Sequence, residues 1–204
     1  MNILALSPHT DDAELGAGGT IARYIDEGAR VHVVALGTGG PNGATRDEFV
    51  GSISSLGVER WILLDYPSRS YHLHRQDILD ELEALRDVIQ PNLVLIPSTA
   101  DLHQDHRTVT TEAMRAFKYS ASLWGYELPT NYVSQPFSPT RFVRLERWHV
   151  DAKIEALRHY KSQWQQAHRD RYMRGDCVTA LLDVRGLQIK VDYAEAFEII
   201  REIR

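Results

Sequence analysis

Cysteine and long apolar runs are both scarce in this chain of 204 residues. Its one cysteine, Cys177, cannot form an internal disulfide, which excludes a fold held together by disulfide bonds. No run approaches the roughly 18 apolar residues that span a bilayer. Residues 1–6 are apolar but lack the basic stretch of a signal peptide. We therefore expect a cytoplasmic protein with no transmembrane segment.

An excess of positive charge is absent as well. The chain has 23 Lys and Arg residues against 28 Asp and Glu residues, which gives a formal net charge of −5, and it has no block of Lys or Arg. Because a mildly acidic surface repels phosphate groups, nucleic acid and anionic membranes are not expected as main partners. Hydrophobic residues make up 43% of the chain, which is ordinary for a globular protein and excludes wholesale disorder.

Predicted strands and helices alternate in the first half of the chain. Residues 14–27 and 78–89 carry apolar side chains at helical spacing, and Gly28 and Pro91 follow them as stops. Short apolar runs predict buried strands at residues 3–6, 31–36, 61–64 and 93–96. This alternation predicts an α/β fold, a three-layer sandwich around a mostly parallel, Rossmann-like sheet.

The second half has a less regular pattern. We expect helices over residues 108–119 and 151–165 and a proline-containing loop region over 124–140 that could wall a cleft. Periodicity leaves residues 193–200 open between strand and helix. No repeat, low-complexity tract or linker divides the chain, so we expect one domain over residues 1–204.

A dense polar cluster follows the first predicted strand. It contains one histidine and three carboxylic acids within six residues: His9, Asp11, Asp12 and Glu14. Open α/β sheets bind ligands at the carboxyl ends of their strands. The acids repel one another unless a cation lies among them, and imidazole and carboxylate both suit zinc. The alternative interpretation is a solvated turn capped by an aspartate.

A second cluster follows the fourth predicted strand, in the order Asp101, His103, Asp105 and His106. The carboxyl ends of parallel strands lie on the same rim of the sheet, so the two clusters are expected to meet. One histidine and one carboxylate from the first cluster, with one histidine from the second, would give three protein ligands. That number leaves coordination positions open, as in catalytic zinc sites. Two histidines and one carboxylate also suit Fe²⁺.

The glycines at positions 16, 18 and 19 permit a helix to approach the sheet closely. They also resemble part of a dinucleotide-binding loop. That interpretation is excluded because the last glycine of the Gly-x-Gly-x-x-Gly pattern is missing and a pyrophosphate would face the acids of the first cluster.

The two clusters together resemble the PIG-L, or LmbE-like, de-N-acetylases. The patterns of that family are usually written His-Pro-Asp-Asp-Glu and His-Pro-Asp-His. The matching segments here are His9-Thr10-Asp11-Asp12 and His103-Gln104-Asp105-His106. Similarity extends to residues 153–163 and 193–197. Thr10 and Gln104 replace the usual prolines, and Ala13 stands where many members have glutamate, with Glu14 beside it.

The resemblance implies a zinc-dependent hydrolase that removes acetyl groups from N-acetylglucosamine-type amino sugars or their conjugates. In that case His9, Asp12 and His106 bind the metal, and Asp11 is the general base. His103 stabilises the oxyanion or protonates the leaving amine, and Asp105 orients His103. The chemistry agrees, because zinc lowers the pKa of a bound water to about 7 and a nearby carboxylate can take its proton.

The substrate-binding residues are harder to identify. Arg46 follows a glycine-rich segment at residues 37–43, and the family often has a sugar-contacting arginine near there; a surface arginine is the alternative. Arg69 is a similar candidate. Asp101 is expected to contact substrate, to support His103, or only to stabilise a turn. The resemblance leaves a homo-oligomer open.

The leading hypothesis is therefore a metal-dependent deacetylase of an N-acetylated amino sugar, with zinc, Fe²⁺ or another divalent ion as cofactor. Two alternatives remain: a metal-binding regulatory or scaffold protein without turnover, and a hydrolase of another amide. The first has no need of a base at Asp11 or of the His103–Asp105 pair.

Overall fold

The computed structural model describes residues 1–39, 44–128, 131, 137–164 and 170–203. Its strands form one sheet in the order β3-β2-β1-β4-β5-β7-β6. These strands are β1 (Asn2–His9), β2 (Arg30–Gly37), β3 (Arg60–Leu63), β4 (Leu93–Pro97), β5 (Ser122–Tyr126), β6 (Arg141–Leu145) and β7 (Tyr193–Arg201). The first five are parallel, while β7 runs antiparallel to β5 and to β6.

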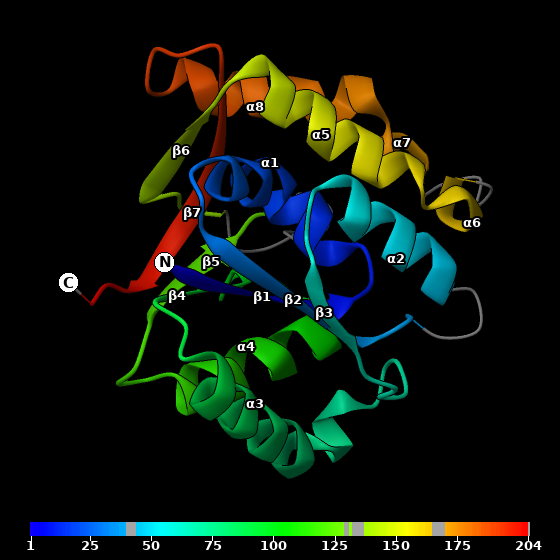
Figure 1. Ribbon diagram of the computed structural model, residues 1–204, viewed down its shortest axis with the longest axis vertical. Helices are drawn as coiled ribbons and strands as arrows, with labels where there is room; N and C mark the ends of the chain where they lie inside the picture. The colour runs from blue at the N-terminus through cyan, green and yellow to red at the C-terminus, as the bar shows by residue number, and fades with distance from the viewer. Residues whose placement is uncertain (40–43, 129–130, 132–136, 165–169, 204) are drawn as a thin grey trace.

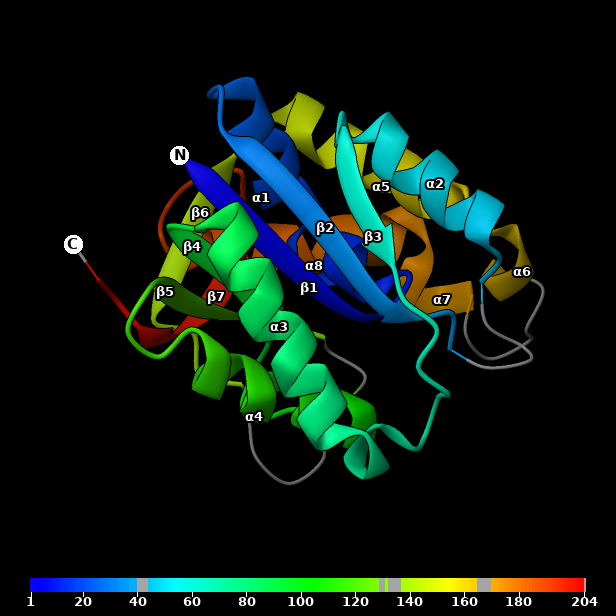
Figure 2. The same ribbon diagram turned by 60° about the horizontal axis from the view of Figure 1, so that its bottom comes forward.

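Helices cover both faces of the sheet (Figure 1). One face carries α1 (Asp12–Asp26), α2 (Arg46–Ser55), α5 (Arg147–Arg158) and α8 (Gly175–Leu187). The other carries α3 (Arg75–Ile89) and α4 (Gln104–Ala116), which lie across the strands in Figure 2. Shorter elements are the 3-10 helix η1 (Tyr71–Leu73), α6 (Lys161–Trp164) and α7 (Asp170–Met173). The predicted three-layer α/β fold with a mostly parallel sheet is confirmed.

Alternating side chains of the central strand explain the two layers of core. Ile3 and Ala5 of β1 pack into the apolar cluster beneath α1, and Leu4 and Leu6 pack into the cluster beneath α3 and α4. A strand with both faces covered has no polar side to present, so its sequence is a continuous apolar run. This is why β1, β2 and β4 lie at the predicted places; β3, an edge strand with exposed residues, was found from its apolar run alone.

The predicted close approach of α1 to the sheet is confirmed at its glycines. A Cβ atom on Gly16 would lie 2.2 Å from Cδ2 of Tyr126, and one on Gly19 would lie 2.5 Å from Cδ1 of Leu145. Gly28 follows α1 with φ +82°, a left-handed conformation that suits its predicted role as the stop.

Several boundaries differ from the prediction. The helix expected over 108–119 begins earlier, at Gln104, and the one expected over 151–165 is divided into α5 and α6. Residues 193–200, left open by periodicity, belong to strand β7. The described residues contain no helix both long enough and apolar enough to cross a membrane.

The loop expected over 124–140 is wrong at its start, because Trp124 and Tyr126 belong to the buried strand β5. They do not wall a cleft: the Trp124 indole N–H donates to Glu202, and the Tyr126 ring packs against Gly16. Residues 129–130 and 132–136 of that predicted loop lie outside the described residues.

Candidate active site

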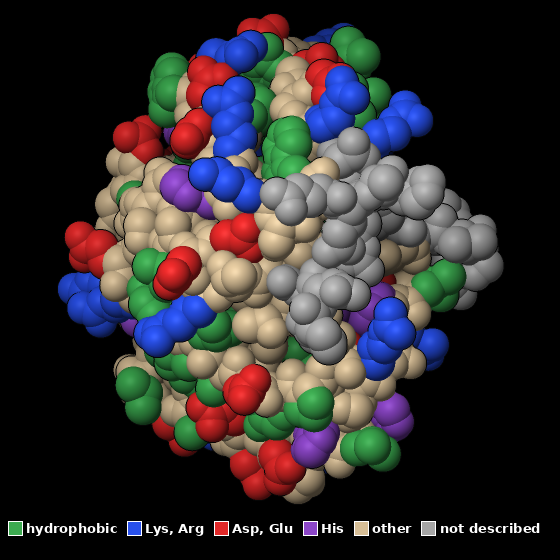
Figure 3. Space-filling view, turned by 90° about the vertical axis from the view of Figure 1, so that its right-hand side faces the viewer, with side chains coloured by type: hydrophobic (Ala, Val, Ile, Leu, Met, Phe, Trp, Pro, Cys, Tyr) green, Lys and Arg blue, Asp and Glu red, His purple; other side chains and the backbone are tan. Residues whose placement is uncertain are grey.

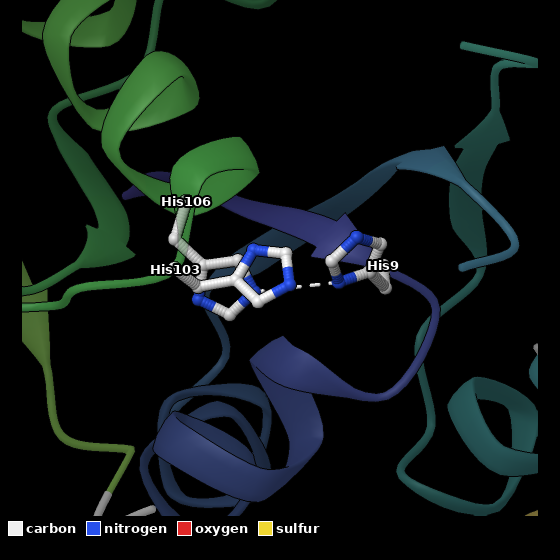
Figure 4. A group of neighbouring side chains, drawn as sticks. All are labelled: His9, His103 and His106. Carbon is white, nitrogen blue, oxygen red and sulfur yellow. Dashed lines mark hydrogen bonds between the residues drawn. The ribbon is translucent and has the colours of Figure 1, made fainter. Parts of the chain in front are cut away.

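The two polar clusters meet at the carboxyl ends of β1 and β4, which are neighbours in the sheet. His9 is the last residue of β1, and Asp11 occupies the N-cap position of α1. His103 caps the N-terminus of α4, and His106 lies in its first turn. Figure 4 shows the three imidazole rings converging from these two segments. The predicted juxtaposition therefore follows from the parallel pairing of the strands.

Three donor atoms form a nearly equilateral triangle. Oδ2 of Asp12 lies 3.2 Å from Nδ1 of His9 and 3.1 Å from Nε2 of His106, and these two nitrogens are 3.3 Å apart. Ligand atoms at tetrahedral angles about 2.0–2.1 Å from a zinc ion stand about 3.3 Å from one another. The side chains thus already have the spacing that a tetrahedral divalent ion requires.

Each histidine of this triangle is held by a carboxylate at its other ring nitrogen. Nε2 of His9 lies 3.1 Å from Oδ2 of Asp105, and Nδ1 of His106 lies 2.8 Å from Oδ2 of Asp101. Carboxylates in this position fix the tautomer and orientation of a metal-binding imidazole. In the neutral form of each ring the proton lies on this outer nitrogen, which leaves the inner nitrogen able to bind a metal.

The structure shows what Asp105 and Asp101, the two acids of the second cluster, contact. The Asp105 carboxylate contacts His9 and accepts the Arg69 amide N–H at 2.7 Å, whereas the Asp105 bond to the His103 ring comes from its backbone N–H. Asp101 is 1% exposed and supports His106, and its other oxygen accepts the His103 backbone N–H. The bond from the His103 backbone N–H agrees with two of the roles left open for Asp101, support of His103 and stabilisation of the turn.

His103 completes a group of three histidines whose nitrogens lie within 4.8 Å of one another. Its Nδ1 accepts the Asp105 backbone N–H at 3.2 Å. A neutral imidazole that accepts at Nδ1 carries its proton on Nε2, so His103 can donate from Nε2. Burial lowers the pKa of His103, and positive charge on His106 and His9 lowers it further.

The electrostatics of the cluster favour positive charge at its centre. Burial opposes charging of His106, but Asp12 and Asp101 outweigh it and raise its pKa to about 10. Burial likewise opposes charging of His9, whose bonds to Asp105 and Asp12 raise its pKa to about 9. Burial works against the ionised form of Asp12, yet His106 and His9 hold its pKa far below the usual range. The side chains that surround this position therefore stabilise a cation there.

Asp11 differs from its neighbour Asp12. Its side chain makes no capping hydrogen bond and lines the cleft. Burial and the adjacent Asp12 charge raise the pKa of Asp11 to about 6. A carboxylate with a pKa nearer neutrality is a better proton acceptor for general-base catalysis than an unperturbed one.

The cluster lies at the bottom of a cleft of about 350 Å³. Figure 3 shows the side of the molecule toward which the strand ends point, where histidine, acidic and basic side chains are exposed. Besides the residues already described, the walls come from several distant segments: Leu15, Thr38, Gly39, Ala44, Ser68, Arg69, Leu128, Asn131, Gln163 and Tyr172.

Of the two arginines predicted to bind substrate, one lines this cleft and the other is not among its described lining residues. Arg69 lines the cleft, in a left-handed backbone conformation (φ +68°). The Asp105 carboxylate accepts the Arg69 backbone N–H, and the Gln104 side-chain amide donates to the Arg69 carbonyl oxygen. Arg46 is not among the described lining residues; its guanidinium stacks on the Trp61 ring, 5.3 Å from the centroid.

Several residues that line the cleft were not predicted from the sequence. Asn131 donates to Asp101 at 2.9 Å, and Gln163 and Tyr172 come from α6 and α7. Gln163 had a usable signal, because it lies in the segment 153–163 that resembles the family. Asn131 and Tyr172 had none.

Comparison with known proteins is consistent with this geometry. The family model described as PIG-L, GlcNAc-PI de-N-acetylase, matches residues 4–117. The chain is 31% identical over 172 residues to YaiS of Escherichia coli (strain K12), which is named an uncharacterised deacetylase; the match covers 78% of this chain and 90% of YaiS. The protein therefore belongs to the PIG-L family of deacetylases.

Two further proteins similar to this chain are named for different reactions. The diacetylchitobiose deacetylase of Thermococcus kodakarensis is 31% identical over 192 residues, with 80% of this chain and 70% of the relative covered. The crystal structure of 4-carboxy-2-hydroxymuconate hydratase from Pseudomonas putida KT2440 has a TM-score of 0.74 at 21% identity and covers 100% of this chain and 97% of its own. The fold alone accordingly does not determine the reaction, which has to be argued from the site.

Proposed function

We propose that this protein is a divalent-metal-dependent deacetylase that hydrolyses the N-acetyl group of an amino sugar or its conjugate. The observation that carries the proposal is the triangle of Nδ1 of His9, Oδ2 of Asp12 and Nε2 of His106, with edges of 3.1–3.3 Å at the bottom of a cleft. Zinc suits this donor set, and so does Fe²⁺.

The chemistry supplied by a bound divalent ion is polarisation of the acetyl carbonyl and activation of water near neutral pH. Asp11 takes the proton of the attacking water, since its carboxylate lines the cleft beside Asp12. His103 donates a hydrogen bond from Nε2 to the developing oxyanion, and the proton that Asp11 has taken from water passes to the departing amine. Asp105 and Asp101 keep His9 and His106 in the required orientation.

The amino-sugar substrate is supported by two observations. The relative from Thermococcus kodakarensis is named for diacetylchitobiose, an N-acetylated sugar. In this chain Arg69 is one of the residues that line the cleft, and a guanidinium offers several N–H donors to sugar hydroxyl groups. A small molecule or the end of a conjugate fits the size of the cleft. The single cysteine and the lack of a membrane-spanning helix among the described residues support a cytoplasmic site of action.

Two alternatives make different predictions. A metal-binding protein without turnover has no need of Asp11 in the cleft or of a donor at His103. A hydrolase of another amide would use the same residues on a different acyl group. Acetate is therefore the product to measure.

The test combines metal content with product release. Purified protein is analysed for metals and then assayed for acetate from a panel of N-acetylated mono- and disaccharides, with non-sugar N-acetyl amines included. We expect about one divalent ion per chain and acetate from at least one sugar. A full complement of metal with no acetate from any substrate would favour the non-catalytic alternative, and acetate from the non-sugar amines alone would favour another amide.

A further inference from the structure

Three tyrosines are the largest fully buried side chains among the described residues: Tyr71, Tyr126 and Tyr160. They come from three separate elements, η1, β5 and the turn that follows α5. Each hydroxyl donates to a backbone carbonyl of the segment that leads into the site. Tyr126 donates to Leu6 at 2.9 Å, Tyr71 to Pro8 at 2.7 Å, and Tyr160 to Thr10.

The pairing of β1 explains why these carbonyls need side-chain donors. On one side β1 pairs with β2 as far as His9, but on the other side it pairs with β4 only through Ala5. Leu6 and Pro8 lie beyond the stretch of β1 that pairs with β4, and Thr10 lies beyond the end of β1, while all three residues are buried. A buried carbonyl without a donor is costly, and the tyrosine hydroxyls meet this need.

Two of the three tyrosines act on the residues directly beside His9. Pro8 and Thr10 are its chain neighbours, and the Tyr71 ring also lies 6.0 Å from the His9 ring, centroid to centroid. The Tyr160 hydroxyl additionally lies 2.6 Å from Oε1 of Glu14, in the first turn of α1. That oxygen accepts the Ser52 hydroxyl at 3.0 Å, which ties α1 to α2. Tyr126, by contrast, acts three residues before His9.

We propose that Tyr71 and Tyr160 are positioning residues for the metal site. They hold the backbone on both sides of His9, so that His9 and Asp12 stand at the metal-binding spacing before a metal arrives. This inference rests on the proposed function, because it assigns the pair a role toward the ion that the site is proposed to bind. Neither tyrosine lines the cleft among the described residues.

The chain offers a matched control for the test. Tyr71→Phe, Tyr160→Phe and Tyr126→Phe each keep a buried ring and each remove one hydroxyl that donates to a carbonyl of the same segment. A purely structural role predicts that Tyr71→Phe and Tyr126→Phe, the matched pair, behave alike in metal binding, and that Tyr160→Phe, which also loses its Glu14 contact, differs from them in stability only. A positioning role predicts that Tyr126→Phe differs from the other two.

The experiment measures zinc affinity of the apoprotein by competition with a chromophoric chelator, together with the thermal unfolding midpoint. We expect comparable falls in the midpoint for Tyr71→Phe and Tyr126→Phe and a larger fall for Tyr160→Phe, which also removes a contact of the buried Glu14 carboxyl. Zinc affinity should fall about tenfold in Tyr71→Phe and Tyr160→Phe, the lower end of the effect of removing residues that orient metal ligands, and stay within about twofold in Tyr126→Phe. In metal-free protein, the amides of residues 9–12 should exchange hydrogen faster in the first two variants only.

One combined result would overturn the proposal. Equal zinc affinity and equal exchange in all three variants would make the tyrosines structural only. If Tyr160→Phe does not fold, Tyr71→Phe decides the same question, since its hydroxyl acts on Pro8 independently. Failure of the proposed function has a different signature, because the wild-type protein itself would then bind no zinc or release no acetate.

Discussion

Two clusters of buried charged groups contact α1, one at its N-terminus and one at Gly19 and Thr20, and they differ in the partners that compensate their charges. Lys153 and Glu195 form a closed pair: their side chains are 3% and 2% exposed, Nζ lies 2.6 Å from Oε1, and the carboxylate also accepts the amides of Gly19 and Thr20. The cluster at the cleft combines three histidines with four carboxylates: Asp11, Asp12, Asp101 and Asp105. None of these four carboxylates forms an ion pair with a lysine or arginine in the part of the chain that the structure describes.

This difference distinguishes a buried ion pair that stabilises the fold from a cluster of side chains that can bind a ligand. A buried ion pair with its hydrogen bonds satisfied needs nothing further. A cluster rich in carboxylates, whose inner histidine nitrogens lie 3.3 Å apart, has the donor atoms and the spacing to hold a metal ion. The comparison predicts that substitutions in the first cluster affect stability and that those in the second affect metal binding and catalysis.

His106→Ala should have the largest effect, because it removes one corner of the triangle. We expect the bound metal to be lost and acetate release to fall to background, while the protein still folds. Metal analysis after gel filtration and an acetate assay measure both. His72→Ala, an exposed histidine outside the site, is the control. Full metal content in His106→Ala would show that the triangle is not the binding site.

Asp11→Asn should come next. The amide keeps the shape of the side chain but cannot accept a proton, so kcat should fall by about 10²–10⁴. Metal content should remain at the wild-type value, because Asp11 is not a corner of the triangle. Steady-state kinetics and metal analysis of the same sample check this. Unchanged kcat would remove Asp11 from the proposed mechanism, and loss of the metal would make Asp11 a ligand.

Asp101→Asn tests the carboxylate behind His106. Asp101 accepts hydrogen bonds from His106, Asn131 and the His103 backbone, and an amide cannot accept all three. Metal affinity should fall by about 10- to 100-fold, the usual effect of losing such a partner. Chelator competition measures it, with the exposed Asp80→Asn as control. Wild-type affinity would mean that His106 needs no support from Asp101.

Glu195→Gln should have the smallest effect on the metal site and a large one on stability. It leaves the Lys153 ammonium buried without its counter-charge, which costs about 3–5 kcal/mol of unfolding free energy. Zinc affinity of the folded protein should stay within about twofold. Denaturant unfolding and chelator competition separate the two quantities. The double variant Lys153→Met with Glu195→Gln should recover much of the lost stability, and a double variant no more stable than the single one would contradict this account of the pair.

The fold was predictable wherever burial leaves a periodic trace in the sequence. The four apolar runs predicted β1 to β4, and the helical spacing of the apolar residues in α3 predicted its buried face. Strand β6 was missed because it is an edge strand with arginines at positions 141 and 144. Helix α2 was missed although Thr45 and Glu48 form a capping box there, a pattern that the sequence displays. Its apolar residues are too few to form a clear stripe.

The candidate site was predictable in its composition but not in its pairing. Strand order brings the two clusters to one rim, which the sequence implies. Which carboxylate supports which histidine depends on contacts between residues 96 positions apart in the case of His9 and Asp105, and no local spacing encodes that. The same holds for Asn131 and Tyr172, which reach the cleft from distant segments. Long-range geometry decides these roles.

Anomalous diffraction at the zinc edge, from crystals of the zinc-loaded protein, tests the central claim most directly. The account predicts one strong peak about 2.0–2.2 Å from each of Nδ1 of His9, Oδ2 of Asp12 and Nε2 of His106. A strong peak held by other side chains, or no peak at the triangle in zinc-saturated crystals, would contradict it.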